Sequence, residues 1–468
     1  MMFENKNYIQ QSEKLAKRYE NDRQHYFALD EFIAISDYYV LNKNYKNALE
    51  VNSTAEIFYP SSFELKAIKA DLYIRNNEFE KAEEVIKKIE CNSETIPDIH
   101  ILKGEICIKK NQYKSAEKQF DKAIKLSDDK DYALEIICDF LMMAHQIQLA
   151  KKYLELAQKI IPSANYDLMY WLAKCYEYES EYGKAANIYE KMTAIDPFDE
   201  NVWDDLGDVY MLMSEYKNAI KAFDFRLAIS NENANETLIN KAECLSMLKK
   251  NNEAIKIYNK ILDFEKENID AMFGIAKCYE REGIYGIAER IYFDIVSQDP
   301  DYKDAYYSLA TIYAQKNEFK TAEQFMQKTL DDAEIIPAFL IQMSKILLQQ
   351  NKITEAKQTM EKFIYNDSCK HDYRTWLLYA EIIAIDDIEK AIDILETKYN
   401  ESFYSIAEIC YHLAYYNFII GNISKCSAYV ECGLEINPNM MTAFFELCPE
   451  VMLNEQIMSI YFAFKTKK

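Results

Sequence analysis

Apolar and small residues recur along this chain in a pattern that predicts pairs of short helices. The pattern is clearest between positions 203 and 223, where the defining residues are Trp203, Leu206, Gly207, Tyr210, Ala219 and Phe223. Residues three or four apart share one face of a helix, so the first four fit one helix and the last two fit a second. The polar stretch 214–216 fits the turn between them. Gly207 and Ala219 are small enough to let the two helices cross closely.

The position of Ala219 has an equivalent every 34 or 35 residues in both directions along the chain. The series is Ala48, Ala82, Ala116, Ala150, Ala185, Ala219, Ala254, Ala288, Ala322, Ala356, Ala391 and Cys426. A second small series precedes it by twelve positions and consists of Ser36, Ala70, Gly104, Cys138, Ala173, Gly207, Ala242, Ala276, Ala310, Ser344 and Ala414. The eleventh repeat, whose turn is one residue shorter, supplies Ala380. A regular period of this length is typical of a repeat array.

Turn-forming residues occur at matching places in the repeats. The residues that would end the first helix of a pair include Asn77, Asn111, Gly283, Asn317, Asn351 and Gly421. Asn and Gly tolerate the left-handed conformation that ends a helix. Prolines, which cannot continue a helix, fall between repeats at Pro60, Pro162, Pro197, Pro300 and Pro438.

The repeat array and the segments on either side of it divide the chain into three parts. We predict an N-terminal capping helix within residues 1–28, a repeat array over 29–440, and C-terminal capping helices within 441–468. The last helix would carry Leu453, Ile457 and Phe464 on its apolar face, because a terminal repeat must cover its own exposed surface. A short basic tail from Lys465 is expected to be disordered.

The stretch from Trp203 to Phe223 resembles the tetratricopeptide repeat, whose signature is Trp-x2-Leu-Gly-x2-Tyr followed by Ala-x3-Phe. The period and the two small series extend this resemblance over residues 29–440. It implies an all-α α-solenoid, a right-handed superhelix of about twelve helix–turn–helix repeats with helical caps. In this family the first helix of each pair lines a concave groove. In overall layout the chain is also similar to long acidic bacterial arrays of this kind that carry no attached enzyme domain.

The net charge and the spacing of the cysteines exclude some classes of partner and of cellular location. The 55 Lys and Arg against 77 Asp and Glu give a formal net charge of −22, which would repel a phosphate backbone, so we expect no nucleic-acid partner. No stretch reaches the roughly 18 apolar residues of a membrane helix, and residues 1–11 lack signal-peptide features. The 11 cysteines are scattered without a Cys-x2-Cys pair. Reduced thiols and a cytoplasmic location are therefore expected.

Residues that would carry catalysis, bind a cofactor or hold a metal are not grouped in the sequence. Phosphate-binding glycine loops and the G-x-S-x-G and H-E-x2-H motifs are absent. The five histidines are far apart, at His25, His100, His145, His371 and His412. We expect His145 to lie in a turn and His371 in a connection between repeats. The sequence therefore predicts no enzyme, no cofactor and no metal site.

The groove implied by the resemblance would be lined by the residue that follows the small position of each first helix. In the first seven repeats these residues are Asp37, Asp71, Glu105, Asp139, Lys174, Asp208 and Glu243, six of which are acidic. Other predicted groove residues are Asp204 and the aromatic residues Tyr170, Phe273, Tyr307 and Tyr411. A track of carboxylates with aromatic neighbours predicts binding of a basic or amphipathic protein segment. The alternative is that these carboxylates only share the general negative charge and contact solvent.

One binding mode of this family does not fit the N-terminal half. Carboxylate-clamp domains hold an acidic chaperone tail with Lys, Asn and Arg, and the matching positions here are acidic and would repel it. Only Lys277 and Lys345, farther along the chain, leave that mode open.

Three functions remain as hypotheses. The first is a non-enzymatic scaffold or adaptor that binds protein segments along its groove. The second is a regulatory or co-chaperone-like subunit of a complex whose catalytic activity resides in another chain. The third is self-association through the end helices.

Overall fold

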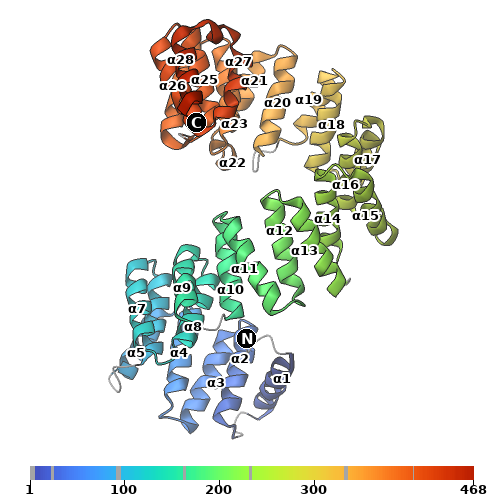
Figure 1. Cartoon of the computed structure of the whole chain (residues 1–468). Coiled ribbons are helices and arrows are strands. Elements are labelled where there is room, and N and C mark those ends of the chain that lie inside the picture. The colour runs from blue at the N-terminus through green and yellow to red at the C-terminus, as the bar shows by residue number, and fades with distance from the viewer. Residues whose placement is uncertain are drawn as a thin grey trace. The chain divides into compact units, whose positions relative to one another are not determined.

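The computed structural model describes residues 6–22, 26–90, 96–161, 165–230, 234–330, 336–403 and 405–467. His25 and Pro162 lie outside these ranges. The chain divides into two compact units, Met1–Thr237 and Leu238–Lys468. Within the described ranges every regular element is a helix, and successive helices of each unit lie side by side in antiparallel pairs (Figure 1). The predicted all-α architecture of stacked helix pairs is confirmed.

The first unit begins with one helix and continues with helix pairs that match the first six predicted repeats. The bounds are α1 Lys6–Asn21, α2 Leu29–Leu41, α3 Tyr45–Phe58, α4 Phe63–Arg75, α5 Phe79–Glu90, α6 Pro97–Lys109, α7 Tyr113–Leu126, α8 Lys130–Met143, α9 Ile147–Ile160, α10 Tyr166–Tyr178, α11 Tyr182–Ile195, α12 Glu200–Leu212 and α13 Tyr216–Ile229.

The second unit holds the later repeats, and its first helix, α14, begins shortly before the unit boundary. The paired helices are α14 Asn235–Met247, α15 Asn251–Phe264, α16 Ile269–Arg281, α17 Tyr285–Gln298, α18 Lys303–Gln315, α19 Phe319–Gln327, α20 Pro337–Gln349, α21 Ile353–Phe363, α23 Tyr373–Ala384, α24 Ile388–Lys398, α25 Ala407–Ile419 and α26 Ile423–Ile436. The remaining elements are α22 Asp367–Lys370, η2 Tyr399–Phe403, η3 Pro438–Met440, α27 Met441–Leu447, η4 Pro449–Leu453 and α28 Glu455–Lys467. The sequence pattern did not predict α22 or η2, which lie in the connections on either side of the eleventh pair.

The small residues of both series occupy the tightest places in the helix pairs. All twelve residues of the first series, from Ala48 to Cys426, are 0% exposed. In the second series, a β-carbon built on Gly207 would stand 2.3 Å from Cε1 of Phe223. The second series therefore makes room for the side chain four positions after the anchor, on the facing helix.

The turns inside the pairs share one backbone conformation. In eleven of the twelve repeats the residue five positions before the anchor has a positive φ, as at Asn77 (59°) and Gly283 (75°). His145 lies in such a turn, with φ 55°, as predicted. Lys249 adopts the same conformation at φ 62° although its residue type does not favour it. The eleventh repeat, whose turn is one residue shorter, has no positive φ between α23 and α24.

The ends of the array are covered by helices that pack on the first and last pairs. In α1, Ala16 and Tyr19 are buried in one cluster with Phe27 and Phe32. At the other end, Ile457 of α28 is buried in a cluster with residues of α25 and α26.

Two details of the predicted C-terminal cap are wrong. Leu453 does not share the apolar face of the last helix, because it ends η4 and is 85% exposed. The tail from Lys465, expected to be disordered, continues α28 as far as Lys467.

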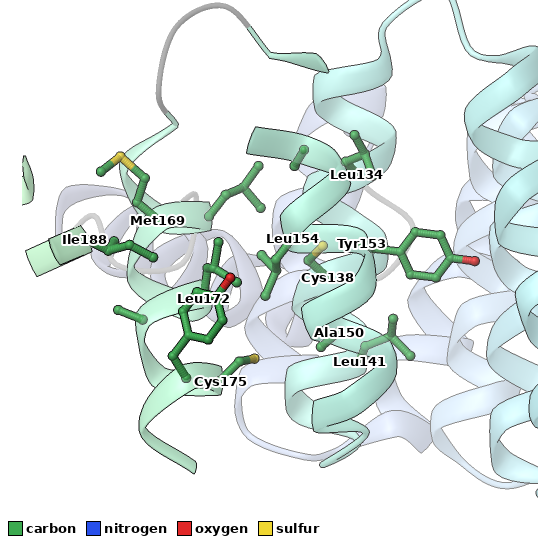
Figure 2. Close-up of a cluster of buried hydrophobic side chains, with 14 of the residues drawn as sticks. Leu134, Cys138, Leu141, Ala150, Tyr153, Leu154, Met169, Leu172, Cys175 and Ile188 are labelled. Carbon is green, nitrogen blue, oxygen red and sulfur yellow. The ribbon is translucent and has the colours of Figure 1, made fainter. Parts of the chain in front are cut away.

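Figure 2 shows how neighbouring pairs share a core in the first unit, where side chains of α8, α9, α10 and α11 converge. Cys138 and Ala150, the two small positions of the fourth repeat, lie within this cluster, and Leu172 joins it from the next repeat. The hydroxyl of Tyr153 points away from the cluster and donates to Oδ1 of Asp121 at 2.9 Å. Each repeat thus buries its apolar face against the next one.

Candidate partner-binding surface

Four of the predicted site residues lie together on the first unit, one on each of the helices α2, α4, α6 and α8. They are Asp37, Asp71, Glu105 and Asp139, which we call the acidic face. Burial is the largest cause of the raised pKa of both Asp37 and Glu105, and the negative charge of Asp71 raises both pKa values further. Asp139 also raises the pKa of Glu105. Such coupling requires carboxyl groups that are near one another, so neighbouring members of the acidic face lie close together.

Two members of the acidic face have partners within the chain. Tyr8 of α1 donates from its hydroxyl to Oδ2 of Asp37 at 2.7 Å. Arg75 donates from Nε to Oδ2 of Asp71 at 2.8 Å, within α4. Arg75 was not among the residues predicted from the sequence, although its spacing of four residues from Asp71 is that of a helical ion pair. Arg75 places a positive charge within the acidic face.

Glu105 differs from the other three acids because it is buried. Its side chain is only 6% exposed and makes no hydrogen bond or ion pair with any described residue. Burial raises the pKa of Glu105 to about 8, and Arg75 and Lys109 oppose the rise. The carboxyl is therefore mostly protonated at neutral pH.

Asp139 is the most accessible member of the acidic face. It is exposed, and partial burial of its carboxyl raises its pKa above the ordinary value for aspartate. Its carboxylate makes no ion pair or hydrogen bond with the described part of the chain. It is consequently the member whose charge is most available to another molecule.

The aromatic residue Tyr170 belongs to a polar network centred on Lys174. Lys174 of α10 donates from Nζ to Oδ1 of Asp205 in α12 at 2.8 Å and lies 3.1 Å from Glu177. It also lies 5.6 Å from the ring centre of Tyr170. Burial raises the pKa of Tyr170 to about 12, and Asp205 adds to the rise. This cation interrupts the acidic series by bridging two repeats.

The second unit repeats this arrangement around Phe273. Lys277 of α16 lies 3.2 Å from Glu280 and 5.6 Å from the ring centre of Phe273. The hydroxyl of Tyr292 donates to Glu280 at 2.6 Å. Glu177 and Glu280 were not predicted from the sequence. Each lies three residues after the lysine, Lys174 or Lys277, and this helical spacing would have indicated them.

Asp204 is held by neighbouring side chains of the first unit. Arg226 of α13 donates to it from Nε at 3.0 Å, and Thr237 donates from its hydroxyl at 2.7 Å. Arg226 is buried and also lies 3.4 Å from Glu200. Asp208, one turn farther along α12, is half-buried.

The remaining predicted site residues belong to the second unit. Glu243 is exposed on α14. Tyr307 of α18 is half-buried and stacks on Phe339 of α20, with ring centres 5.1 Å apart. Phe273 is likewise half-buried and packs on Tyr292 with ring centres 5.6 Å apart. Both rings thus contribute to packing between helices.

The described residues offer neither a membrane span nor a metal site. No described helix is both long and apolar enough to cross a membrane. Across the ranges that the structure covers, no three His, Cys, Asp or Glu side chains are grouped to hold a metal ion.

Comparison with known families identifies the helix pairs. The sequence model of the tetratricopeptide repeat matches residues 97–130, which span α6 and α7, and residues 303–331, which include α18 and α19. The chain carries tetratricopeptide repeats. The first of the matched repeats contains Glu105.

Several known proteins are similar to this chain. Anaphase-promoting complex subunit 6 of Arabidopsis thaliana is 28% identical over 131 residues, which are 27% of this chain and 24% of that protein. The match thus spans about a quarter of the length of this relative.

Two solved structures are also similar. A tetratricopeptide repeat protein of Parabacteroides merdae covers 54% of this chain and 98% of its own at 19% identity and a TM-score of 0.47. A chain of the APC/C hetero-tetramer Cut9–Hcn1 is 14% identical to this chain, with a TM-score of 0.39. The match covers 95% of this chain and 94% of that chain.

Proposed function

We propose that this protein is a non-enzymatic scaffold or adaptor that binds a basic segment of another protein along the acidic face of its first unit. The observation that carries the proposal is the grouping of Asp37, Asp71, Glu105 and Asp139 on successive first helices. The charges of Asp37, Asp71 and Asp139 add in one region, and complementary charge is what selects and steers a protein partner. Tetratricopeptide repeats present such a continuous surface because each repeat stacks on the next.

The four acids do not contribute equally to this surface. Asp37 accepts a hydrogen bond from Tyr8 and Asp71 pairs with Arg75, so part of their charge is already compensated. Asp139 is exposed and supplies charge directly to a ligand. Asp204, whose carboxylate is held by Arg226 and Thr237, is assigned a structural role instead.

The experiment is a titration of the full-length protein with a fluorescent peptide of alternating Arg and Ala whose termini are blocked. Binding that weakens by at least about tenfold between 50 and 500 mM salt is expected, because exposed charges are screened beyond the Debye length. Binding that is absent, or indifferent to salt, would overturn the proposal.

A matched pair of variants locates the interaction. Asp139→Asn is expected to weaken the peptide about three- to fivefold, in keeping with one exposed ion pair. Glu84→Gln removes the same charge from α5, where Glu84 is exposed and makes no hydrogen bond or ion pair with any described residue. Equal effects of the two variants would show that only the net charge of the protein matters.

The second candidate function is that of a subunit in a larger complex whose activity resides in another chain. It is favoured by the 28% identity to anaphase-promoting complex subunit 6, a protein named as part of such a complex. Purification of the protein from its own cells should then recover a second chain in fixed stoichiometry. Recovery of the protein alone, at the mass of a single chain, would remove this candidate.

A further inference from the structure

We propose that Glu105 and Asp139 together form a site for a single arginine side chain of the bound segment. This inference rests on the proposed function and names the chemistry at the centre of the acidic face. The guanidinium group suits the site because its planar fork of five donors can serve two carboxylates at once. It is also more weakly hydrated than an ammonium group, so it loses less on entering a buried place.

The unusual position of Glu105 is the observation that singles out this place. A buried carboxyl without a hydrogen bond is costly, and native proteins rarely keep one without a use. Glu105 is 6% exposed and has no hydrogen-bond partner among the described residues. Other buried side-chain oxygens, such as Oγ of Ser36, have no partner and are fully sealed from solvent, a state that neither oxygen of Glu105 shares. A donor arriving from solvent can therefore reach the carboxyl.

The charges around Glu105 leave room for one added cation. On the neighbouring first helices it faces Asp71 with Arg75 in α4 and Asp139 in α8. Lys109 stands four residues later on its own helix, α6. Arg75 is already engaged by Asp71 and also acts to lower the pKa of Asp139, which makes no hydrogen bond or ion pair with the described residues.

Three acids on the second helices that pack against α6 are engaged by lysines. Glu83 and Glu90 of α5 pair with Lys110 and Lys103 of α6. In α7, Glu117 pairs with Lys152 of α9. These groups contribute no free cation to Glu105.

Binding of the arginine has a consequence for protons. The free site holds Glu105 largely protonated at neutral pH, because burial raises the pKa of its carboxyl to about 8. A guanidinium group favours the carboxylate, so binding releases the proton from Glu105 to solvent. Affinity is then expected to rise with pH until the carboxyl is ionised in the free protein, and to level off above that point.

The experiment measures the affinity of the full-length protein for the blocked Arg–Ala peptide as pH is raised. An increase of about tenfold between pH 6.5 and pH 8.5 is expected for the wild type, since one proton is released over this range. Glu105→Gln, which keeps the shape of the side chain, should bind more weakly at pH 8.5 and lose this dependence. Glu84→Gln, the control for net charge, should retain it. A Lys–Ala peptide of the same length should bind more weakly than the Arg–Ala peptide.

The outcomes separate this inference from the proposed function. Peptide binding that depends on salt but not on pH, with Glu105→Gln equal to the wild type, would overturn the arginine site and leave the scaffold function intact. Equal affinity for the Lys–Ala peptide would overturn the choice of arginine. No binding at any pH would overturn the proposed function itself.

Discussion

Arg226 of α13 donates from Nε to Oδ2 of Asp204 in α12 at a distance of 3.0 Å, and its side chain is 6% exposed. This pairing distinguishes two kinds of acid among the predicted groove residues. Asp204 compensates a buried cation of its own repeat, whereas Asp139 has no such partner among the described residues. We expect substitution of the two residues to affect different properties.

Asp204→Asn should lower the stability of the first unit. Removing the Asp204 carboxylate leaves the buried Arg226 with only Glu200 to offset its charge, and the weakened hydrogen bond to a charged group costs about 1–3 kcal/mol. Chemical denaturation followed by circular dichroism would measure the loss. Asp139→Asn is the control, since its surface carboxylate is expected to change stability by less than about 0.5 kcal/mol. Similar losses in both variants would contradict the separate roles.

Glu105→Gln should stabilise the protein at alkaline pH. The folded-state pKa of Glu105, about 8, lies above the ordinary value of 4.5, so its contribution is fully present below about pH 4.5 and is lost as pH rises through 8. The variant has no carboxyl to ionise and escapes that loss. We expect a gain of up to about 3 kcal/mol at pH 9 and little change at pH 5. A variant that is less stable than the wild type at pH 9 would contradict the burial of a carboxyl without partners.

Gly207→Val should destabilise the sixth repeat. A β-carbon on Gly207 would stand 2.3 Å from Cε1 of Phe223, so the two helices must separate or the ring must move. Overpacking of this kind costs about 1–3 kcal/mol. Gly183→Ala in α11 is the matched control, because nothing lies within 4 Å of its added carbon. The control should be neutral or more stable by about 0.5–1 kcal/mol, through lower entropy of the unfolded chain. Differential scanning calorimetry would compare the two, and an equal loss in both would refute the packing account.

The helix pairs could be predicted from the sequence because small residues recur in every repeat at the two places where the helices of a pair pack most closely. A single small residue such as Ala219 carries little information, but its recurrence fixes the register of every pair. The positive φ of the turns could be predicted at Asn77 and Gly283, because Asn and Gly favour this conformation. The positive φ of Lys249 could not be predicted from its residue type. The helices on both sides of the turn impose this conformation on it.

The candidate surface could be predicted only in part. The period placed Asp37, Asp71, Glu105 and Asp139 at one register, and the structure brings them together. Periodicity does not show which of these carboxyl groups is buried, because burial depends on contacts between neighbouring helices. The difference between buried Glu105 and exposed Asp139 therefore required the structure. The same holds for the pairing of Asp204 with Arg226, which are 22 residues apart in the chain.

Hydrogen–deuterium exchange of the full-length protein, with and without the blocked Arg–Ala peptide, tests the central claim most directly. If the acidic face is the binding surface, the peptide should slow exchange in α4, α6 and α8, and Asp139→Asn should reduce that protection. Protection confined to other helices, or binding with unchanged exchange in these three, would contradict the account.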